Sequence, residues 1–285
     1  MRNDSHHARS PDAKSPDAKD LRAQSARDRP SSRQAQIEEL RDRGYVVVPR
    51  FVPDEGLAKL NEAARAQLTA RADPLELEAD LQYPGAPQSR AAAGGETVRR
   101  LLDAYARDPV FAGWGTAPEL RDWMAAYFGE RVLMSRVHHN CLMTKHPRYG
   151  SLTNWHRDIR YWSFAVEDLV SVWFALGEEE MSNGALWFVP GSHRQVFPAD
   201  RFDEGRFFRA DVADNAEILR NAESPRLAPG DAVFFHCNTL HSAGRNLSDA
   251  VKFSLVYTYH SRSNAPMPGT RSASKPEVEL KLTAE

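Results

Sequence analysis

The sequence predicts a mainly β fold with flanking helices, and three observations support this fold class. Residues 169–176 form an apolar run, Leu-Val-Ser-Val-Trp-Phe-Ala-Leu, with the length and composition of a buried strand. Residues 183–193 predict a turn, a strand and a second turn, because Asn-Gly and Pro-Gly pairs bound an apolar stretch. Residues 230–236 predict another strand, which begins at a Pro-Gly turn. We therefore expect an all-β core.

The N-terminal half adds helices and the first strand. Ile37 and Leu40 predict a short helix that ends at Gly44, and the next residues, Tyr45 to Pro49, predict a strand. Further elements are expected at 53–68 (helix), 73–95 (long loop), 96–107 and 117–128 (helices) and 131–143 (strand). A loop as long as 73–95 is typical of a lid or a binding surface.

The chain is expected to contain one domain between two tails. Residues 1–34 have few large apolar side chains and repeat Ser-Pro-Asp-Ala-Lys, so burial cannot offset their ordering entropy. We expect a disordered N-terminal tail over 1–34, the β domain over 35–264 and a flexible C-terminal tail over 265–285. His6 and His7 are interpreted as tail residues rather than metal ligands.

Composition limits the function classes. The formal net charge of −2 argues against a nucleic-acid-binding protein, which is usually basic. Two cysteines, Cys141 and Cys237, are too few for a disulfide framework and indicate a reducing compartment. The sequence has no apolar run of membrane-spanning length and no signal peptide, so we expect a cytoplasmic protein, with peripheral membrane contact left open. The Ala- and Arg-rich composition is typical of a bacterial protein, and the sequence does not define an oligomeric state.

The segment His156-Arg157-Asp158 is the most informative feature of the chain. On a strand, His156 and Asp158 would point to one face and Arg157 to the other. Together with the distant His241, they supply two imidazoles and one carboxylate, the set that binds non-haem Fe(II) and leaves coordination positions open. We therefore predict that these three residues ligate iron.

Two other histidines, His236 and His193, are interpreted as structural. His236 lies on an apolar strand, and His193 closes a Pro-Gly-Ser-His turn. His138 and His139 are adjacent on a predicted strand, so at most one of them can point inward.

Several motifs, in order, resemble the phytanoyl-CoA dioxygenase family of Fe(II)- and 2-oxoglutarate-dependent oxygenases. They are Gly44-Tyr-Val-Val-Val-Pro49, Trp155-His-Arg-Asp158, the strand that contains Trp173, Asn183-Gly184, Pro190-Gly-Ser-His193, Gly230-Asp231 and His241-Ser-Ala-Gly-Arg-Asn246. The resemblance covers residues 44 to about 259. It implies a double-stranded β-helix, the cupin-like jelly roll, with His156, Asp158 and His241 as iron ligands.

The resemblance also implies a site for 2-oxoglutarate. The family has an arginine eleven positions after the distal histidine, and this chain has Lys252 there. Lysine is a point charge and cannot bind a carboxylate through two parallel bonds as arginine does. Lys252 and Ser254 share a strand face and are predicted to bind the far carboxylate of 2-oxoglutarate, with Trp173 lining the pocket. Arg245, in a turn, is the competing candidate.

Basic residues around the predicted ligands indicate an anionic substrate. Arg160 follows Asp158 by two positions and would share its face on a continuing strand. Arg157 and Lys145 are expected near the mouth of the same pocket, from their positions in the sequence and in the family. A guanidinium there would bind a carboxylate or phosphate through two hydrogen bonds, so we predict that these three residues bind the substrate, such as an envelope sugar acid or an amino-acid-like metabolite.

The predicted function is therefore an Fe(II)- and 2-oxoglutarate-dependent dioxygenase, with O2 as second co-substrate, that hydroxylates an unactivated C–H of a small anionic molecule. Asp158 favours hydroxylation over halogenation, because related halogenases have a small residue in place of that carboxylate. Two alternatives are a non-catalytic cupin-type binding protein and an iron oxygenase that does not use 2-oxoglutarate. The sequence does not identify the substrate.

Overall fold

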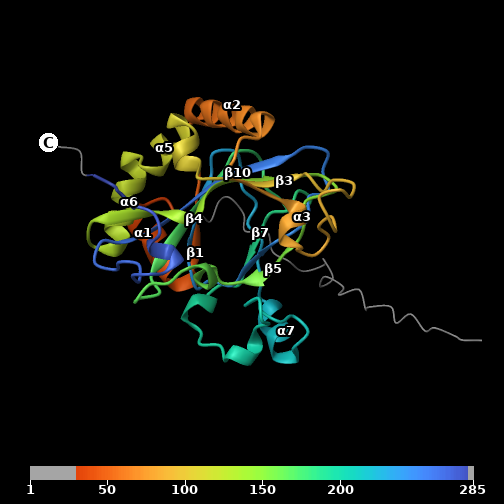
Figure 1. Ribbon diagram of the computed structural model, residues 1–285. Coiled ribbons are helices and arrows are strands. Elements are labelled where there is room, and N and C mark those ends of the chain that lie inside the picture. Colours follow the sequence, from red (N-terminus) through yellow and green to blue (C-terminus); the bar gives the residue numbers. More distant parts are fainter. Residues whose placement is uncertain (1–29, 282–285) are drawn as a thin grey trace, which may run out of the picture.

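The computed structural model of the protein describes residues 30–281, and two antiparallel sheets form the centre of this part of the chain. The larger sheet has the strand order β1-β8-β6-β10-β4-β3-β2 (Figure 1). Strand β11 pairs with the beginning of β4, and β3 pairs with its end. Its strands are β1 (Tyr45–Val48), β2 (Leu75–Leu77), β3 (Val98–Leu102), β4 (Val132–Lys145), β6 (Leu169–Ala175), β8 (Ala232–His236), β10 (Lys252–Ser261) and β11 (Val278–Glu279).

The smaller sheet has the order β5-β9-β7 and consists of β5 (Thr153–His156), β9 (His241–Ala243) and β7 (Leu186–Phe188). Strand β9 begins at His241, which pairs in register with His156 at the end of β5. The chain alternates between the sheets, because β5, β7 and β9 of the smaller sheet come between β4, β6, β8 and β10 of the larger one. Two antiparallel sheets connected in this way form a jelly roll. The predicted fold class is confirmed.

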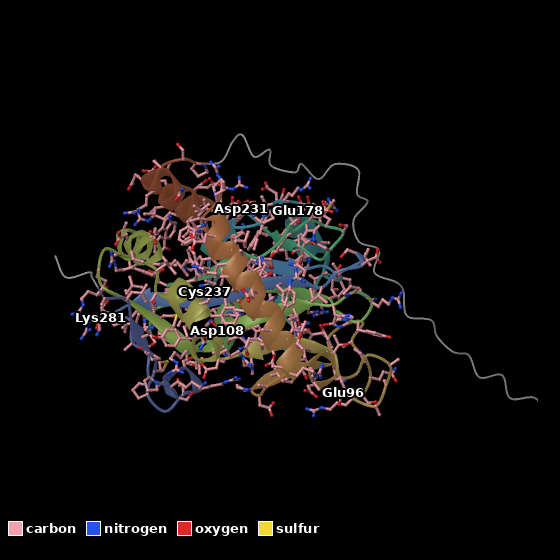
Figure 2. The ribbon with its side chains drawn as sticks, turned by 90° about the horizontal axis from the view of Figure 1, so that it is seen from above. Glu96, Asp108, Glu178, Asp231, Cys237 and Lys281 are labelled. Atoms are coloured by element: carbon pink, nitrogen blue, oxygen red, sulfur yellow. The ribbon has the colours of Figure 1, made fainter. Side chains whose placement is uncertain are left out.

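Helices cover one face of the larger sheet and supply part of its apolar core. They are α1 (Arg33–Arg43), α2 (Asp54–Ala70), α4 (Ala104–Arg107), α5 (Pro109–Gly115) and α6 (Pro118–Phe128). Two other helices lie outside this layer, namely α3 (Glu78–Leu81), which follows β2, and α7 (Ala213–Leu219), which packs on a separate apolar cluster. Figure 2 shows α2 lying across the sheet, and Figure 1 shows α7 at the opposite end of the molecule from α2. Among the described residues, none of the helices is both long and apolar enough to cross a bilayer.

Alternation along the strands separates two apolar layers. In β6, Val172 and Phe174 belong to the core beneath the helices, whereas Trp173 and Ala175 belong to the cluster between the sheets. Val233 and Val256 flank Trp173 in register and face the same inner space. Because successive strand residues point to opposite faces, the helices complete one face of the sheet and the other face is left for a site.

Several local predictions need correction. The helix expected at 96–107 is strand β3 followed by the single turn α4, and the loop expected at 73–95 contains β2 and α3. The expected C-terminal tail is wrong up to residue 281, because β11 pairs with β4 and the side chain of Leu280 is buried in the core. The chain is already helical from Arg33, and most of the predicted N-terminal tail lies outside the described residues.

Candidate iron and co-substrate site

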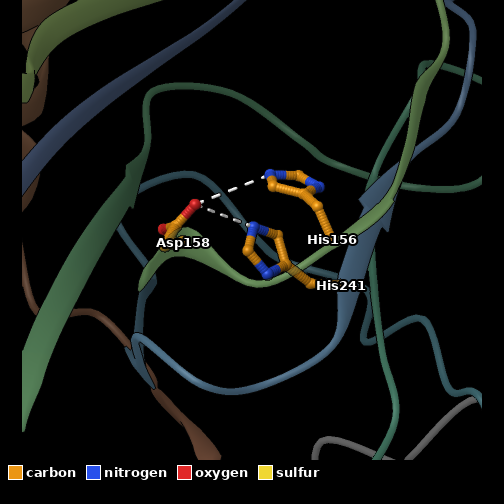
Figure 3. A group of neighbouring side chains, drawn as sticks. All are labelled: His156, Asp158 and His241. Carbon is orange, nitrogen blue, oxygen red and sulfur yellow. Dashed lines mark ion pairs between the residues drawn. The ribbon is translucent and has the colours of Figure 1, made fainter. Parts of the chain in front are cut away.

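The three predicted iron ligands come together at one end of the smaller sheet (Figure 3). His156 ends β5 and His241 begins β9, so the register of two paired strands sets the two imidazoles side by side. Asp158 does not continue the strand, contrary to the prediction, but begins a short 3₁₀ helix, Asp158–Tyr161. This turn brings its carboxylate to the imidazoles, and one potential ligand atom from each residue lies within 4.8 Å of the others.

Hydrogen bonds fix the orientation of both imidazoles. Nδ1 of His156 lies 2.8 Å from the backbone oxygen of Asn154, and Nδ1 of His241 lies 3.0 Å from that of Thr239. A carbonyl can only accept, so each Nδ1 carries the proton and each Nε2 has a free lone pair. Both Nε2 atoms face Oδ1 of Asp158, at 3.5 Å from His156 and 3.4 Å from His241.

The carboxylate of Asp158 is buried, and its two oxygens have different surroundings. Oδ2 accepts a hydrogen bond from Ser171 Oγ at 3.4 Å and lies 3.4 Å from Nδ1 of His139. Oδ1 has no hydrogen-bond donor among the described residues. This buried oxygen receives no hydrogen bond and faces two imidazole lone pairs. A divalent metal ion would bind all three atoms and satisfy them. The residues therefore fit iron.

The protonation states of His156 and Asp158 suit metal binding. For His241, burial opposes protonation, but Asp158 outweighs burial and raises the pKa of this imidazole. Burial lowers the pKa of His156 to about 4, and His241 acts in the same direction, so this imidazole is neutral at pH 7. Burial opposes ionisation of Asp158, but His139 and His241 outweigh it and hold the pKa of that carboxyl well below its usual range. A neutral imidazole and an ionised carboxylate are the forms that ligate metal.

An irregularity in β4 supplies His139. The register between β10 and β4 shifts between Tyr257 and Thr258, and His138 there has a left-handed backbone with φ 58°. Bulges re-aim side chains next to active sites. His139 lines the cavity, whereas the His138 ring packs edge-on against Trp162 at 4.7 Å. His236 lies elsewhere, 3.6 Å from Asp168.

A narrow cavity of about 50 Å³ lies beside the three residues. Its apolar walls include Leu186, Phe235 and Val256, which belong to the cluster between the two sheets. Four cations also line it, namely Arg99, Arg100, Lys145 and Lys252.

The site predicted for the co-substrate carboxylate already holds a carboxylate of the protein, that of Glu179. Its Oε2 accepts from Lys252 Nζ at 2.6 Å, and its Oε1 accepts from Ser254 Oγ at 2.6 Å and from Trp173 Nε1 at 2.9 Å. Glu179 is fully buried. The three predicted residues do come together, but around an internal anion. Sequence reasoning missed Glu179, because it stands within a run of three glutamates typical of a solvated loop.

Two of the three predicted substrate residues lie outside the cavity. Arg157 donates to the backbone oxygens of Ser192 and Gln195, at 2.6 Å and 2.7 Å. The Arg160 guanidinium stacks on the Phe207 ring, 3.8 Å from its centroid, because the chain turns into a 3₁₀ helix where a strand was expected.

Of the predicted substrate residues, only Lys145 lines the cavity. Arg245 donates to the backbone oxygen of Arg148 and is absent from the lining, so it does not compete with Lys252. Sequence reasoning missed Arg99 and Arg100, because their segment was predicted to be helical and was not connected with the site.

A jelly roll that holds two imidazoles and one carboxylate at its mouth defines the class of non-haem iron oxygenases. The chain matches the phytanoyl-CoA dioxygenase family over residues 40–254. It therefore belongs to this family of Fe(II)- and 2-oxoglutarate-dependent oxygenases, and the predicted family, enzyme class and cofactors are confirmed.

Relatives and solved structures agree with this family. The chain is 28% identical to the ectoine dioxygenase of Sphingopyxis alaskensis over 252 residues, which cover 82% of this chain and 77% of that one. It is 24% identical to the human peroxisomal phytanoyl-CoA dioxygenase, over 72% of this chain and 61% of that one. The crystal structure of EctD from S. alaskensis with 2-oxoglutarate and 5-hydroxyectoine has the same fold, with a TM-score of 0.68 at 22% identity over 90% of this chain and 86% of that one.

Proposed function

We propose that the protein hydroxylates an unactivated C–H bond of a small molecule, with iron held by His156, Asp158 and His241. The observation that carries this proposal is the convergence of two fixed imidazole lone pairs on the donor-free Oδ1 of Asp158. A cupin-type binding protein without catalysis is disfavoured by membership of an oxygenase family. The carboxylate of Asp158 favours hydroxylation over halogenation, because related halogenases have a small residue at that position.

The chain's own residues orient the ligands and exclude water. Ser171 donates to Oδ2 of Asp158 and His139 lies 3.4 Å from it, so Oδ1 is the oxygen that would bind the metal. The apolar walls keep bulk water from the reacting atoms, and electrostatic interactions are stronger in such a cavity. When bound, iron and 2-oxoglutarate supply the activation of dioxygen that side chains cannot perform.

The substrate is proposed to be small and anionic, and Arg100 replaces Arg157 and Arg160 as the residue that binds its charge. Arg100 lines the cavity, and its buried Nε lies 3.3 Å from Oε2 of Glu76 without hydrogen-bond geometry. Guanidinium groups bind carboxylates and phosphates in a planar, two-bonded geometry. A guanidinium that lines the cavity therefore favours a carboxylate or phosphate ligand.

The test is a screen of carboxylated, phosphorylated and neutral metabolites with the Fe(II)-loaded protein, measured as succinate released from 2-oxoglutarate. We expect substrate-dependent succinate that the D158A variant does not form. Oxygen consumption without a requirement for 2-oxoglutarate would contradict the proposed reaction. A preferred substrate that is neutral, or unchanged specificity in R100Q, would contradict the anionic substrate alone.

A further inference from the structure

Of the four cations that line the cavity, three have a carboxylate partner and one has a backbone oxygen. Three of them form ion pairs, which are Arg99 with Glu78 at 3.2 Å, Arg100 with Glu76 at 3.3 Å and Lys252 with Glu179 at 2.6 Å. The fourth, Lys145, donates from Nζ to the backbone oxygen of Ser151 at 2.9 Å. Within residues 30–281, no carboxylate oxygen lies within 4.0 Å of its ammonium group.

Lys145 is held inside the protein. The residue is only 9% exposed, and it pairs in register with Lys252 on the neighbouring strand. Its stem passes Gly184, where a Cβ would lie 3.1 Å from Cε of Lys145. Gly184 also has a φ of 81°, which favours glycine. The local structure therefore leaves room for this lysine on a path into the cavity.

An ammonium group in this position lacks a counter-charge. Burial of a charge is unfavourable unless an opposite charge and hydrogen bonds compensate for it. Burial lowers the pKa of Lys145 well below its usual range, and Arg99 and Lys252 act in the same direction. The two carboxylates that act against them, Glu78 and Glu179, are each bound to another cation. An anionic ligand would complete the charge balance.

Lys252, unlike Lys145, already has a counter-charge. Its ammonium is bound to Glu179, whose two oxygens accept three hydrogen bonds from buried donors. Lys252 lines the cavity, but Glu179 already compensates its charge. A ligand carboxylate that displaced Glu179 would separate a buried ion pair, which is strongly unfavourable. Placed beside Glu179, a second carboxylate would be repelled.

We propose that Lys145, rather than Lys252, binds the carboxylate of 2-oxoglutarate that lies away from the iron. This inference rests on the proposed function, because it assigns a residue to the co-substrate of that reaction. The buried pair of Lys252 and Glu179 then has a structural role, in which it holds Trp173 and Ser254 in the cavity wall.

The test compares two ligands that differ in one group. Anaerobic calorimetry on the Fe(II)-loaded protein measures the affinity for 2-oxoglutarate and for 2-oxopentanoate, which has a methyl group in place of the far carboxylate. The wild type should prefer 2-oxoglutarate by about 10- to 100-fold, the range of a hydrogen bond between charged groups. K145M should bind both ligands equally, with 2-oxopentanoate bound as in the wild type.

The matched control is K252M/E179M, which removes a neutral pair and should keep the preference for 2-oxoglutarate. K145Q provides a second neutral variant, and thermal unfolding of each protein verifies its fold. Preference retained in K145M or K145Q, or lost in K252M/E179M, would overturn the assignment of Lys145 while leaving the proposed function intact. Failure of the Fe(II)-loaded wild type to bind either ligand would refute the proposed function itself.

Discussion

Replacement of Glu179 by glutamine should destabilise the protein strongly. The substitution keeps the shape of the side chain but removes the charge that faces Lys252 Nζ at 2.6 Å, in a pair whose side chains are 0% and 5% exposed. Loss of one partner from a buried ion pair costs about 3–5 kcal/mol, because the other charge remains buried without compensation. For a domain of this size, such a loss lowers Tm by roughly 10 °C.

The assay is equilibrium unfolding in urea of the wild type, E179M, K252M and K252M/E179M, which together form a double-mutant cycle, with E179Q measured beside them. Each single variant should lose several kcal/mol of unfolding free energy, whereas the double variant should lie within about 2 kcal/mol of the wild type, because apolar pairs often replace buried ion pairs without loss. Additive effects, or a loss below about 1 kcal/mol in E179Q, would show that the pair does not form in solution, and the structural role of Glu179 would be refuted.

Three further predictions follow from the site and the fold. H241A should abolish Fe(II) binding, measured by anaerobic titration, without lowering Tm of the metal-free protein, and iron binding at the wild-type level would exclude His241 as a ligand. K145M should stabilise the metal-free protein by about 1–3 kcal/mol, the cost of burying an incompletely bonded polar group. Burial lowers the pKa of Lys145 below the unfolded value of 10.5, so the unfolded chain binds more protons and the stability of the wild type rises with pH. The stability advantage of K145M over the wild type should therefore shrink as pH approaches 10. An advantage that grows with pH would contradict this sign. L280A should lose about 2–5 kcal/mol of unfolding free energy, because the side chain is 4% exposed in the core, and an unchanged urea midpoint would show that β11 is not docked.

The strand pattern and the metal residues could be predicted from sequence because both depend on local signals. Apolar runs such as 169–176 and 230–236 identify buried strands by composition, and the paired turns bound them. His156 and Asp158 are two residues apart, so any extended or turning backbone keeps them close. The geometry itself was not predictable at that level, since Asp158 reaches the imidazoles through a 3₁₀ turn.

The placement of the charges was decided by the tertiary structure. Glu179 is 73 residues from Lys252 in the chain, and its run of glutamates gives no sign that the middle one is buried. Arg157 and Arg160 face away from the cavity because the backbone turns after His156. Among the four cations that line the cavity, Lys145 alone has no carboxylate partner within the described part of the chain. Residue types and local spacing determined the kind of chemistry, because ligands are chosen by their donor atoms. Which charges meet depends on contacts between distant segments, and only the folded chain defines those contacts.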